Sequence, residues 1–589
     1  MAEFTAGDQE VTNIGRRMSE FQWNKGRTTQ DEKGNEAVAT TDFQGVIDEA
    51  KEATDHEHRM GVFEAIKTYP KAVGWSVLAS TALVMEGYDL VVIGSFYGYP
   101  TFLKKYGALQ PDGTYQISAA WESGLSNGAV IGEILGLTAT GLIADKMGYR
   151  FTIGLALCLV ICFIFITFFA VNIQMLLVGE ILCGLPWGVF QTITTAYAAE
   201  VTPVALRPYL TTYVNLCWVM GQFVGSGVLR GLVNYTTQWG YRIPFAVQWI
   251  WPIPLLIGIL FAPESPWWLV RQGRLDDAER ALKRLTSKSS SGNDFDPAKT
   301  VAMMLHTNEL EKEQTVGTSY FDCFKGTDLR RTEIASMTWM IQTFCGSGLG
   351  GYSTQFYEQA GLSTTYSFDL AMAQYALGAI GTICSWFLMA RFGRRSIYLW
   401  GLVALDLFLF VIGFVGIAPS TNKAAPWVVG SMLLVHVFTY DLTVGPVCYC
   451  LVAEISSTRL RSKTIVIARN FYNIIGIFNN IITPRMINPT AFDWGAKAAF
   501  FWAGFCTISI VWTYFRLPEP KGKTYAELDI LFENKVSARK FGSATVDPFR
   551  GQSVVVRNGS VVRADGTAFD DVNYGGNEDK SGATYKETI

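Results

Sequence analysis

Long apolar stretches alternate with short polar segments over most of the chain. Twelve of these stretches reach the roughly 17–25 residues that a helix needs to cross a bilayer. They lie near 72–98, 118–144, 150–170, 172–199, 207–233, 241–261, 331–357, 366–390, 396–418, 426–453, 460–484 and 494–516. The pattern therefore predicts an all-α membrane protein with twelve transmembrane helices.

Three polar regions divide the chain. Both ends are rich in Gly, Ser, Thr and acidic residues without a sustained apolar period, which is typical of disordered tails. A central polar linker has apolar residues at helical spacing over 275–285, which predicts short surface helices. The expected division is a tail over 1–70, a six-helix half over 71–261, a linker over 262–330, a second six-helix half over 331–517 and a tail over 518–589.

The two halves carry the same signals in the same order. Glu200 precedes Arg207 by seven residues, and Glu454 precedes Arg461 by seven. The segments 145–150 and 390–395 also correspond, as do Pro263-Glu264 and Pro518-Glu519. Two membrane halves of like orientation, related by an axis along the membrane normal, are a plan that transporters use.

Composition narrows the function. The chain is 49% hydrophobic and only 17% charged, against about 25% charged in soluble domains. Its net charge of −3 gives no reason to expect a nucleic-acid partner. We find no nucleophile–base pair, no metal-ligand spacing and no nucleotide-binding loop, so we expect neither an enzyme nor a cofactor nor a metal site.

Basic residues predict the orientation. Lys and Arg are frequent in the loops after the second, fourth, eighth and tenth stretches and in the linker, and are rare in the alternate loops. Basic loops stay on the cytosolic side. We therefore expect both termini to be cytosolic.

Ionisable residues inside the membrane cost about 2.5–3.5 kcal/mol each and need a reason. Such residues are Glu86, Asp89, Glu133, Glu180 and Arg469. Buried acids near a movable arginine can carry a proton together with a substrate. The structural alternative is a set of static ion pairs that hold helices together, and both interpretations stay open.

Glycines, prolines and aromatic residues mark several stretches. Gly346 to Gly351 fall in the seventh stretch, while Pro186, Pro252 and Pro446 interrupt others, and such breaks are tolerated where the freed backbone lines a cavity. Close packing of small residues is the alternative. Aromatic rings near such breaks can stack on sugars, and the candidates are Trp218, Tyr352, Tyr357 and Tyr449.

Six motifs in order resemble the sugar porters of the major facilitator superfamily. The resemblance covers about 70–517. The motifs are Gly87-Tyr88-Asp89, Asp145 to Arg150, Pro263 to Leu269, Arg391 to Arg395, Gly445-Pro446 through Glu454, and Pro518 to Gly522.

A narrower resemblance points to one subfamily. Met85 to Asp89, Gly179 to Gly188 and Pro266 to Arg271 are similar to fungal maltose-type α-glucoside:proton symporters. The resemblance implies a plasma-membrane protein that imports maltose or a related α-glucoside together with protons, by alternating access of its two halves. We expect it to work as a monomer in the lipid bilayer.

Departures from the hexose-porter pattern bear on the substrate. Asn215 stands in the fifth stretch where a Gln is usual, Gln342 is kept in the seventh, and Ser347 and Gly351 replace larger side chains. Smaller side chains widen a pocket, which suits a sugar of more than one ring. The expected substrate-binding residues are Asn215, Trp218, Gln342, Ser347, Tyr352 and Tyr449.

The coupling residues depart too. In proton-coupled hexose porters the acid at the position of Asp89 pairs with an arginine in the fourth span, but here that position resembles Glu180. Arg469 is the remaining cation, and the α-glucoside resemblance supports it. We expect Glu86, Asp89, Glu133 and Arg469 to form the coupling group, without assigning the proton to one acid.

Charged residues at the cytosolic helix ends are expected to lock that side while the sugar site faces outward. Simple capping of helix ends is the alternative, and Ala390 replaces the acid expected in the second half. The expected gate residues are Asp145, Arg150, Glu200, Arg207, Arg391, Arg395, Glu454 and Arg461.

Two other functions stay open. An uncoupled monosaccharide facilitator is favoured by the missing arginine in the fourth span and opposed by Glu86 and Asp89. A transporter-like sugar sensor has little support. Such receptors usually carry a long cytosolic extension, whereas the tail of this chain has only about 70 residues.

Overall fold

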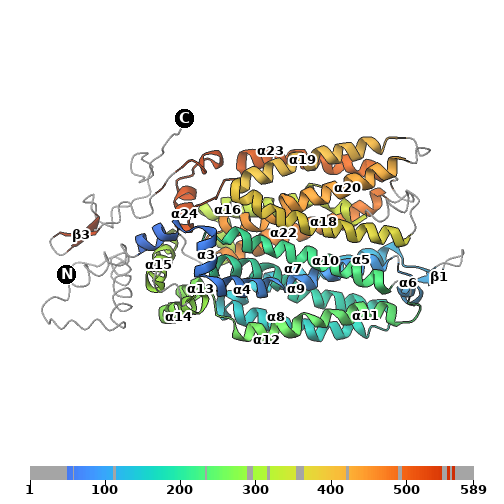
Figure 1. Cartoon of the computed structure of the whole chain (residues 1–589), viewed down its shortest axis with the longest axis horizontal. Coiled ribbons are helices and arrows are strands. Elements are labelled where there is room, and N and C mark those ends of the chain that lie inside the picture. The colour runs from blue at the N-terminus through green and yellow to red at the C-terminus, as the bar shows by residue number, and fades with distance from the viewer. Residues whose placement is uncertain are drawn as a thin grey trace.

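The structure is a computed structural model, and helices dominate it (Figure 1). It describes residues 50–57, 59–97, 99–109, 115–232, 235–287, 296–314, 319–352, 364–418, 424–487, 492, 494–544, 546, 554–557 and 560–563. Figure 1 shows the helices of the N-terminal half on one side of the bundle and those of the C-terminal half on the other.

Each half is a set of long, roughly parallel helices. The N-terminal half holds α4 (Pro70–Ser80), α5 (Leu83–Phe96), α7 (Ala119–Met147), α8 (Tyr149–Phe168), α9 (Ile173–Val201), α10 (Arg207–Leu232), α11 (Trp239–Val247), η1 (Gln248–Ile250) and α12 (Pro252–Phe261). The C-terminal half holds α16 (Gly326–Phe344), η4 (Ser347–Tyr352), α18 (Thr364–Arg391), α19 (Arg394–Val415), α20 (Ala424–Leu442), α21 (Val444–Ile455), α22 (Arg461–Ile487), η5 (Gly495–Lys497) and α23 (Ala498–Arg516).

Within the described residues, ten helical segments are long and apolar enough to cross a membrane. They match ten of the twelve expected spans. The remaining two positions, the fifth and the seventh, are occupied by the more polar helices α10 and α16, which pack along α5 and α22 respectively. The expected all-α, twelve-helix architecture is consistent with this arrangement.

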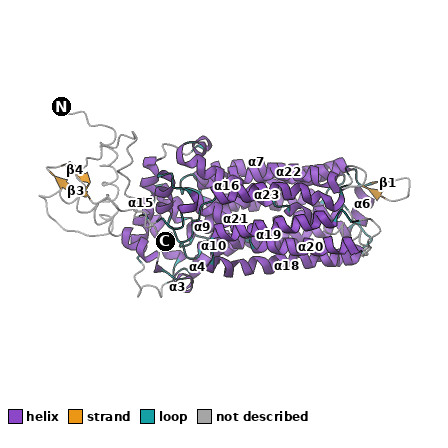
Figure 2. Ribbon diagram, turned by 90° about the horizontal axis from the view of Figure 1, so that it is seen from above, coloured by secondary structure: helices purple, strands orange, loops and turns teal. Residues whose placement is uncertain are grey.

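Shorter elements lie beyond the bundle. At one end, which we call the linker end, are α3 (Val62–Thr68), α13 (Pro266–Arg271), α14 (Leu275–Leu285), α15 (Pro297–Gln314), η3 (Tyr320–Phe324), α24 (Tyr525–Glu533) and η6 (Ala538–Lys540) (Figures 1 and 2). At the other end are α6 (Pro100–Tyr106) and the antiparallel pair β1 (Ala108–Leu109) and β2 (Tyr115–Gln116). A second antiparallel pair, β3 (Val554–Arg557) and β4 (Ser560–Arg563), follows near the C-terminus.

The linker helices agree with the sequence pattern. Helix α14 covers the segment with the expected helical period and buries Ala278, Ala281, Leu282 and Leu285 on one face. Helix α24 lies in the region for which a mostly disordered tail was expected. It begins with a capping box in which Thr524 and Glu527 satisfy each other's backbone N–H groups.

Glycines let helices of one half approach closely. A Cβ atom on Gly87 of α5 would collide with the backbone of Trp218 in α10, and one on Gly221 of α10 would collide with the backbone of Val84. Gly132 and Gly184 make the same reciprocal approach between α7 and α9. Packing of small residues therefore explains these glycines.

Breaks in the helices fall near some of the expected positions. Helix α9 runs unbroken through Pro186, whereas Pro252 begins α12 after the 3-10 turn η1. Pro446 lies in the first turn of α21, directly after the junction with α20, where its missing N–H costs no intrahelical bond. Gly346 ends the seventh span with a φ of 82°, a conformation that favours glycine.

Candidate functional site

A buried polar cluster links the two halves at the middle of the bundle. Glu86 of α5 is 1% exposed, and its Oε1 accepts hydrogen bonds from Gln191 Nε2 at 2.6 Å and from Trp218 Nε1 at 3.2 Å. Gln191 Oε1 in turn accepts from Arg469 Nε at 2.6 Å, and Arg469 Nη2 lies 3.6 Å from Glu86 Oε1. Because Arg469 belongs to α22, these contacts join the C-terminal half to α5, α9 and α10.

Aromatic rings hold the guanidinium of Arg469 in place. Its Cζ lies 4.4 Å from the ring centroid of Trp339 and 4.3 Å from that of Tyr472. A desolvated cation over such ring faces gains electrostatic attraction from the ring quadrupole. Glu133 of α7 is 3% exposed and interacts electrostatically with the same arginine. Three of the four expected coupling residues, Glu86, Glu133 and Arg469, are thus brought together.

The fourth, Asp89, has different partners. Its Oδ1 accepts a hydrogen bond from Gln248 Nε2 of η1, and the carboxyl group of Glu180 lies against it. Both carboxyl oxygens of Glu180 are buried. Asp89 therefore faces a second acid and an amide, while Glu86, three positions earlier, faces the arginine.

The expected sugar-binding residues fall into two groups. Trp218 donates to Glu86, and Tyr449 packs edge-on against Trp339 with centroids 4.8 Å apart, so both border the Arg469 cluster. On the same helix as Trp339, Gln342 Oε1 accepts from Tyr440 Oη at 2.6 Å, and the Gln342 carbonyl accepts from Ser347 Oγ at 2.7 Å.

Asn215 lies apart from this group. Its Nδ2 donates at 3.2 Å both to Thr382 Oγ1 of α18 and to Asp441 Oδ1 of α20. These bonds also cross between the halves. The side chain of Tyr352 and all of Tyr357 lie outside the described residues.

A second charged cluster, which we call the latch, lies at the linker end and consists of Glu200, Arg461, Arg271, Asp145 and Lys463. Glu200 Oε1 lies 3.1 Å from Arg271 Nη1 and 3.2 Å from Arg461 Nη1, and the side chains of Glu200 and Arg461 are fully buried. Lys463 Nζ pairs with Asp145. The ion pairs Glu200–Arg461 and Asp145–Lys463 each cross from one half to the other.

Neutral contacts support the latch. Tyr149 Oη donates to Glu200 Oε1 at 3.1 Å and lies 3.2 Å from Ser462 Oγ, and Ser265 Oγ also donates a hydrogen bond to Glu200.

At the opposite end of the bundle, Arg230 of α10 and Asp369 of α18 form an ion pair of 2.9 Å, and their side chains are 33% and 40% exposed. Exposed pairs stabilise little, whereas a buried pair is costly to break.

In the C-terminal half the corresponding acid has an internal partner. Glu454 Oε1 lies 3.2 Å from Arg394 Nη2, and both belong to the C-terminal half. Arg394 occupies the position that Tyr149 holds in the N-terminal half. Because Tyr149 brings no charge to Glu200, the cation for that acid comes from Arg461 of the other half and from Arg271.

Two acids cap the helices that follow the loop motifs. Glu264 accepts backbone N–H groups of Tyr149 at 3.0 Å and Arg150 at 3.1 Å. Glu519 accepts those of Arg394 at 2.9 Å and Arg395 at 3.0 Å. Burial raises the pKa of both carboxyl groups, and these backbone bonds only partly offset it.

The remaining expected gate arginines contact backbone atoms or a ring. Arg150 Nη2 donates to the Leu260 carbonyl, and Arg395 Nη2 donates to the Tyr514 carbonyl at 2.8 Å, in each case within one half. The side chain of Arg391 is exposed, and its carbonyl accepts from Lys521 Nζ at 3.1 Å. Arg207 is 3% exposed, and its guanidinium carbon lies 3.9 Å from the ring centroid of Tyr525.

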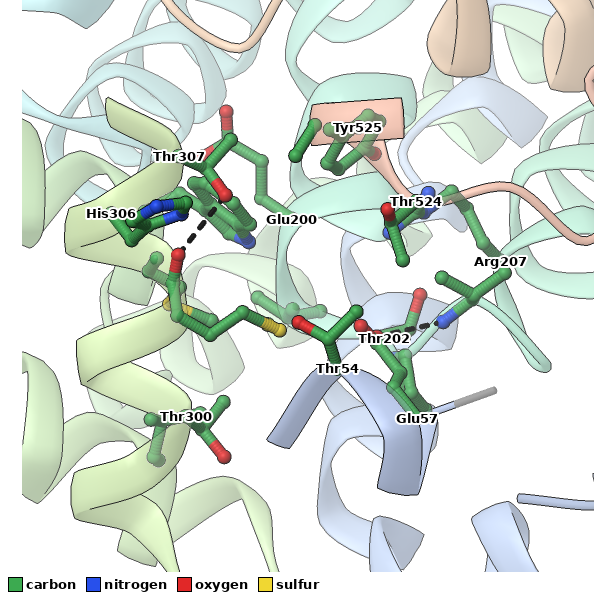
Figure 3. Close-up of a pocket in the computed structure, with 18 of the residues that line it drawn as sticks. Thr54, Glu57, Glu200, Thr202, Arg207, Thr300, His306, Thr307, Thr524 and Tyr525 are labelled. Atoms are coloured by element: carbon green, nitrogen blue, oxygen red, sulfur yellow. Dashed lines mark hydrogen bonds between the residues drawn. The ribbon is translucent and has the colours of Figure 1, made fainter. Parts of the chain in front are cut away.

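Tyr525 of α24 was not expected from the sequence. Its ring also lies 4.1 Å from the guanidinium carbon of Arg461, so one ring contacts an arginine from each half. Figure 3 shows Tyr525, Arg207 and Glu200 around a small cavity that residues 50–57, α9, α15 and α24 border. Gln191 and Gln248 were also not expected at the site. The sequence marks each of them only as an amide side chain within an apolar stretch.

Comparisons with known proteins identify the family of the chain. Residues 75–532 match the family described as sugar (and other) transporters. A maltose permease of Saccharomyces cerevisiae, MAL31, is 45% identical over 507 residues, which cover 85% of this chain and 82% of the permease. A general alpha-glucoside permease of the same species is 42% identical over 535 residues, which cover 90% of this chain and 86% of the permease.

Solved structures share the fold. The proton:xylose symporter XylE bound to 6-bromo-6-deoxy-D-glucose superposes with a TM-score of 0.67 at 20% identity, covering 79% of this chain and 99% of XylE. An inward-open XylE from E. coli gives 0.58 at 20% identity, covering 78% and 99%. The match to the family over most of the chain, together with the two-half helical bundle, shows that this multi-pass membrane protein belongs to the sugar (and other) transporter family.

Proposed function

We propose that the chain imports maltose or a related α-glucoside across the plasma membrane together with protons, by alternating access of its two halves. The names of the maltose and alpha-glucoside permeases that it resembles support the substrate. The observation that carries the coupling is the buried contact of Glu86 with Gln191 and Arg469, since it spans both halves.

The proposed coupling depends on the movement of one half against the other. When one half rocks against the other, α5 and α22 change their separation, and Glu86 loses or regains its cation. An acid that has lost its cation in a dry environment is stabilised by a proton. Proton uptake and the change of access are then linked, without a choice among Glu86, Asp89 and Glu133 as the carrier.

The two ends of the bundle have different roles in this proposal. The linker end carries most of the basic loop residues and is assigned to the cytosol, and with it both termini. The latch holds that end closed while the sugar site is open to the outside. The proposed sugar contacts are Asn215, Trp218, Gln342, Ser347, Tyr352 and Tyr449, with the small Ser347 and Gly351 leaving room for a second ring.

Uncoupled monosaccharide transport is the second candidate. It is favoured by one observation, that Asp89 faces Glu180 instead of a cation. Sugar binding without transport, as in a sensor, is a further outcome of the same test.

The test is uptake of radiolabelled maltose and glucose into cells that lack their own sugar carriers, with external pH recorded in lightly buffered medium. Maltose uptake with matching alkalinisation, lost in Asp89→Asn, is the expected result. Asp406→Asn is the matched control, because that acid lies between α19 and α23, where Thr507 donates to it at 3.0 Å. Maltose uptake without a pH change would contradict the coupling, glucose uptake alone would support the facilitator, and sugar binding without uptake would support the sensor.

A further inference from the structure

A basic cavity lies at the linker end, apart from the central cluster and from the latch. It has a volume of about 440 Å³ and lies between α14, α13 and the adjacent ends of α7 and α8. Four arginines line it, Arg150, Arg274, Arg280 and Arg284, together with the acids Asp277 and Glu264. Figure 1 shows α14 beside the linker ends of α8 and α12.

The charges around this cavity do not balance. Asp277 is shared by two arginines, with Arg274 Nη2 at 2.6 Å and Arg280 Nη2 on its other oxygen. Glu264 is occupied by backbone N–H groups at the start of α8. Four positive groups thus face two negative ones, and both acids already have partners.

Two of the arginines have no carboxylate partner among the described residues. Arg150 and Arg284 reach the last carbonyl groups of α12, those of Leu260 and Phe261, the second at 2.5 Å. A carbonyl accepts a hydrogen bond but does not neutralise a guanidinium charge. These two arginines therefore converge on the end of a membrane helix, and neither forms an ion pair within the described part of the chain.

The cavity lies next to the lipid-facing surface of the bundle. Helices α8 and α12 expose large apolar side chains, with Phe151 at 49%, Ile257 at 57% and Phe261 at 65% exposure. In a membrane protein such side chains face lipid tails. The cavity thus lies where this apolar surface ends, and the side chains of Arg280 in α14 and Arg274 just before it are 73% and 56% exposed.

We propose that this cavity binds the phosphate-bearing headgroup of an anionic phospholipid from the adjacent leaflet. Arginine offers planar pairs of N–H donors that match phosphate oxygens. Basic pockets at the cytosolic surface of membrane proteins attract anionic lipids. Binding would attach the linker helix α14 to the membrane beside α8, whose first turn Glu264 caps.

The test measures lipid binding by the full-length protein, independently of transport. Protein purified in a mild detergent is titrated with phosphatidylinositol, with phosphatidylcholine and with soluble inositol hexakisphosphate, and retained ligand is counted by native mass spectrometry. The variant is Arg280→Gln with Arg284→Gln. The matched control is Lys283→Gln, which removes the same kind of charge from the exposed surface of α14 but does not line the cavity.

We expect phosphatidylinositol to bind in preference to phosphatidylcholine, and the double variant to bind it about 25-fold more weakly, about fivefold for each charge removed. Lys283→Gln should bind like the wild type. Equal binding by the wild type and the double variant would overturn the proposal. Tighter binding of inositol hexakisphosphate than of the lipid would also overturn it, in favour of a soluble phosphate ligand. Monodisperse elution and unchanged thermal unfolding show that the double variant is folded.

Discussion

Glu200 of α9 and Arg461 of α22 lie 261 positions apart in the chain, yet Glu200 Oε1 and Arg461 Nη1 are 3.2 Å apart and both side chains are fully buried. The two residues belong to different halves, so any opening of the linker end must separate them. Arg271 shares the acid, which keeps Glu200 compensated when Arg461 leaves. The latch can therefore open without stranding a buried anion.

Replacement of Arg461 by Gln should open the linker end. Because Arg271 still pairs with Glu200, the loss is that of one charge-assisted contact between the halves, about 1.5–3 kcal/mol, and 1.5 kcal/mol already changes a two-state population by about tenfold. The measurement uses a Ser462→Cys reporter and a membrane-impermeant maleimide in inside-out vesicles. The labelling rate of the reporter thiol should rise when Arg461→Gln is added.

The control is Arg516→Gln combined with the same Ser462→Cys reporter. Arg516 pairs with Glu333 within the C-terminal half, and their side chains are 45% and 34% exposed, so its loss should cost less than about 1 kcal/mol. Equal labelling rates with either substitution would show that Glu200–Arg461 does not hold the linker end closed.

Much of the fold could be predicted because apolar length and helical period are local properties. Helix α14 spans the residues with the expected period, and α10 begins at Arg207, where the fifth apolar stretch begins. The pairing of charges could not be predicted in the same way. Arg207 follows Glu200 by seven positions, and both were expected at the cytosolic gate, but Arg207 packs on Tyr525 and the cations of Glu200 are Arg461 and Arg271.

The central cluster shows a similar limit. Glu86 and Asp89 are three positions apart on α5, and both were expected in one coupling group. In the structure their side chains point in different directions. Glu86 contacts the amide of Gln191 in α9, whereas Asp89 contacts the amide of Gln248 in η1. Which helix lies on either side of α5 depends on packing that a single sequence does not encode locally.

Substitution of Glu86 by Gln should uncouple sugar movement from protons. The amide keeps the shape and a hydrogen-bonding group for Trp218 and Gln191, but it cannot carry a proton or pair with Arg469. We expect accumulation of maltose against its gradient to be lost, while exchange of internal for external maltose continues within about threefold of the wild type. Loss of exchange together with accumulation would indicate that Glu86 holds the sugar or the fold instead.

Replacement of Arg469 by Lys should impair transport although it keeps the charge. A lysine ammonium cannot stack as a plane between Trp339 and Tyr472 while it bonds Gln191. We expect the maximal rate of maltose uptake to fall at least tenfold. Arg485→Lys, an exposed position on the same helix, should leave the rate unchanged, and a similar fall there would mean that α22 is generally intolerant of lysine.

Tyr525 should matter through its ring and not through its hydroxyl. The ring contacts both Arg207 and Arg461, whereas the hydroxyl lies 3.4 Å from the Ala199 carbonyl oxygen. Tyr525→Phe should therefore behave like the wild type.

Tyr525→Ala removes the surface on which an arginine from each half packs. Two cation–π contacts at a partly desolvated site together stabilise by about 1–2 kcal/mol. We expect the alanine variant to label the Ser462→Cys reporter about tenfold faster in inside-out vesicles and to transport maltose more slowly, because the closed state of the linker end is less populated. If Tyr525→Phe opened the linker end as much as Tyr525→Ala, the hydroxyl contact would be the important one and α24 would act through Ala199 of α9.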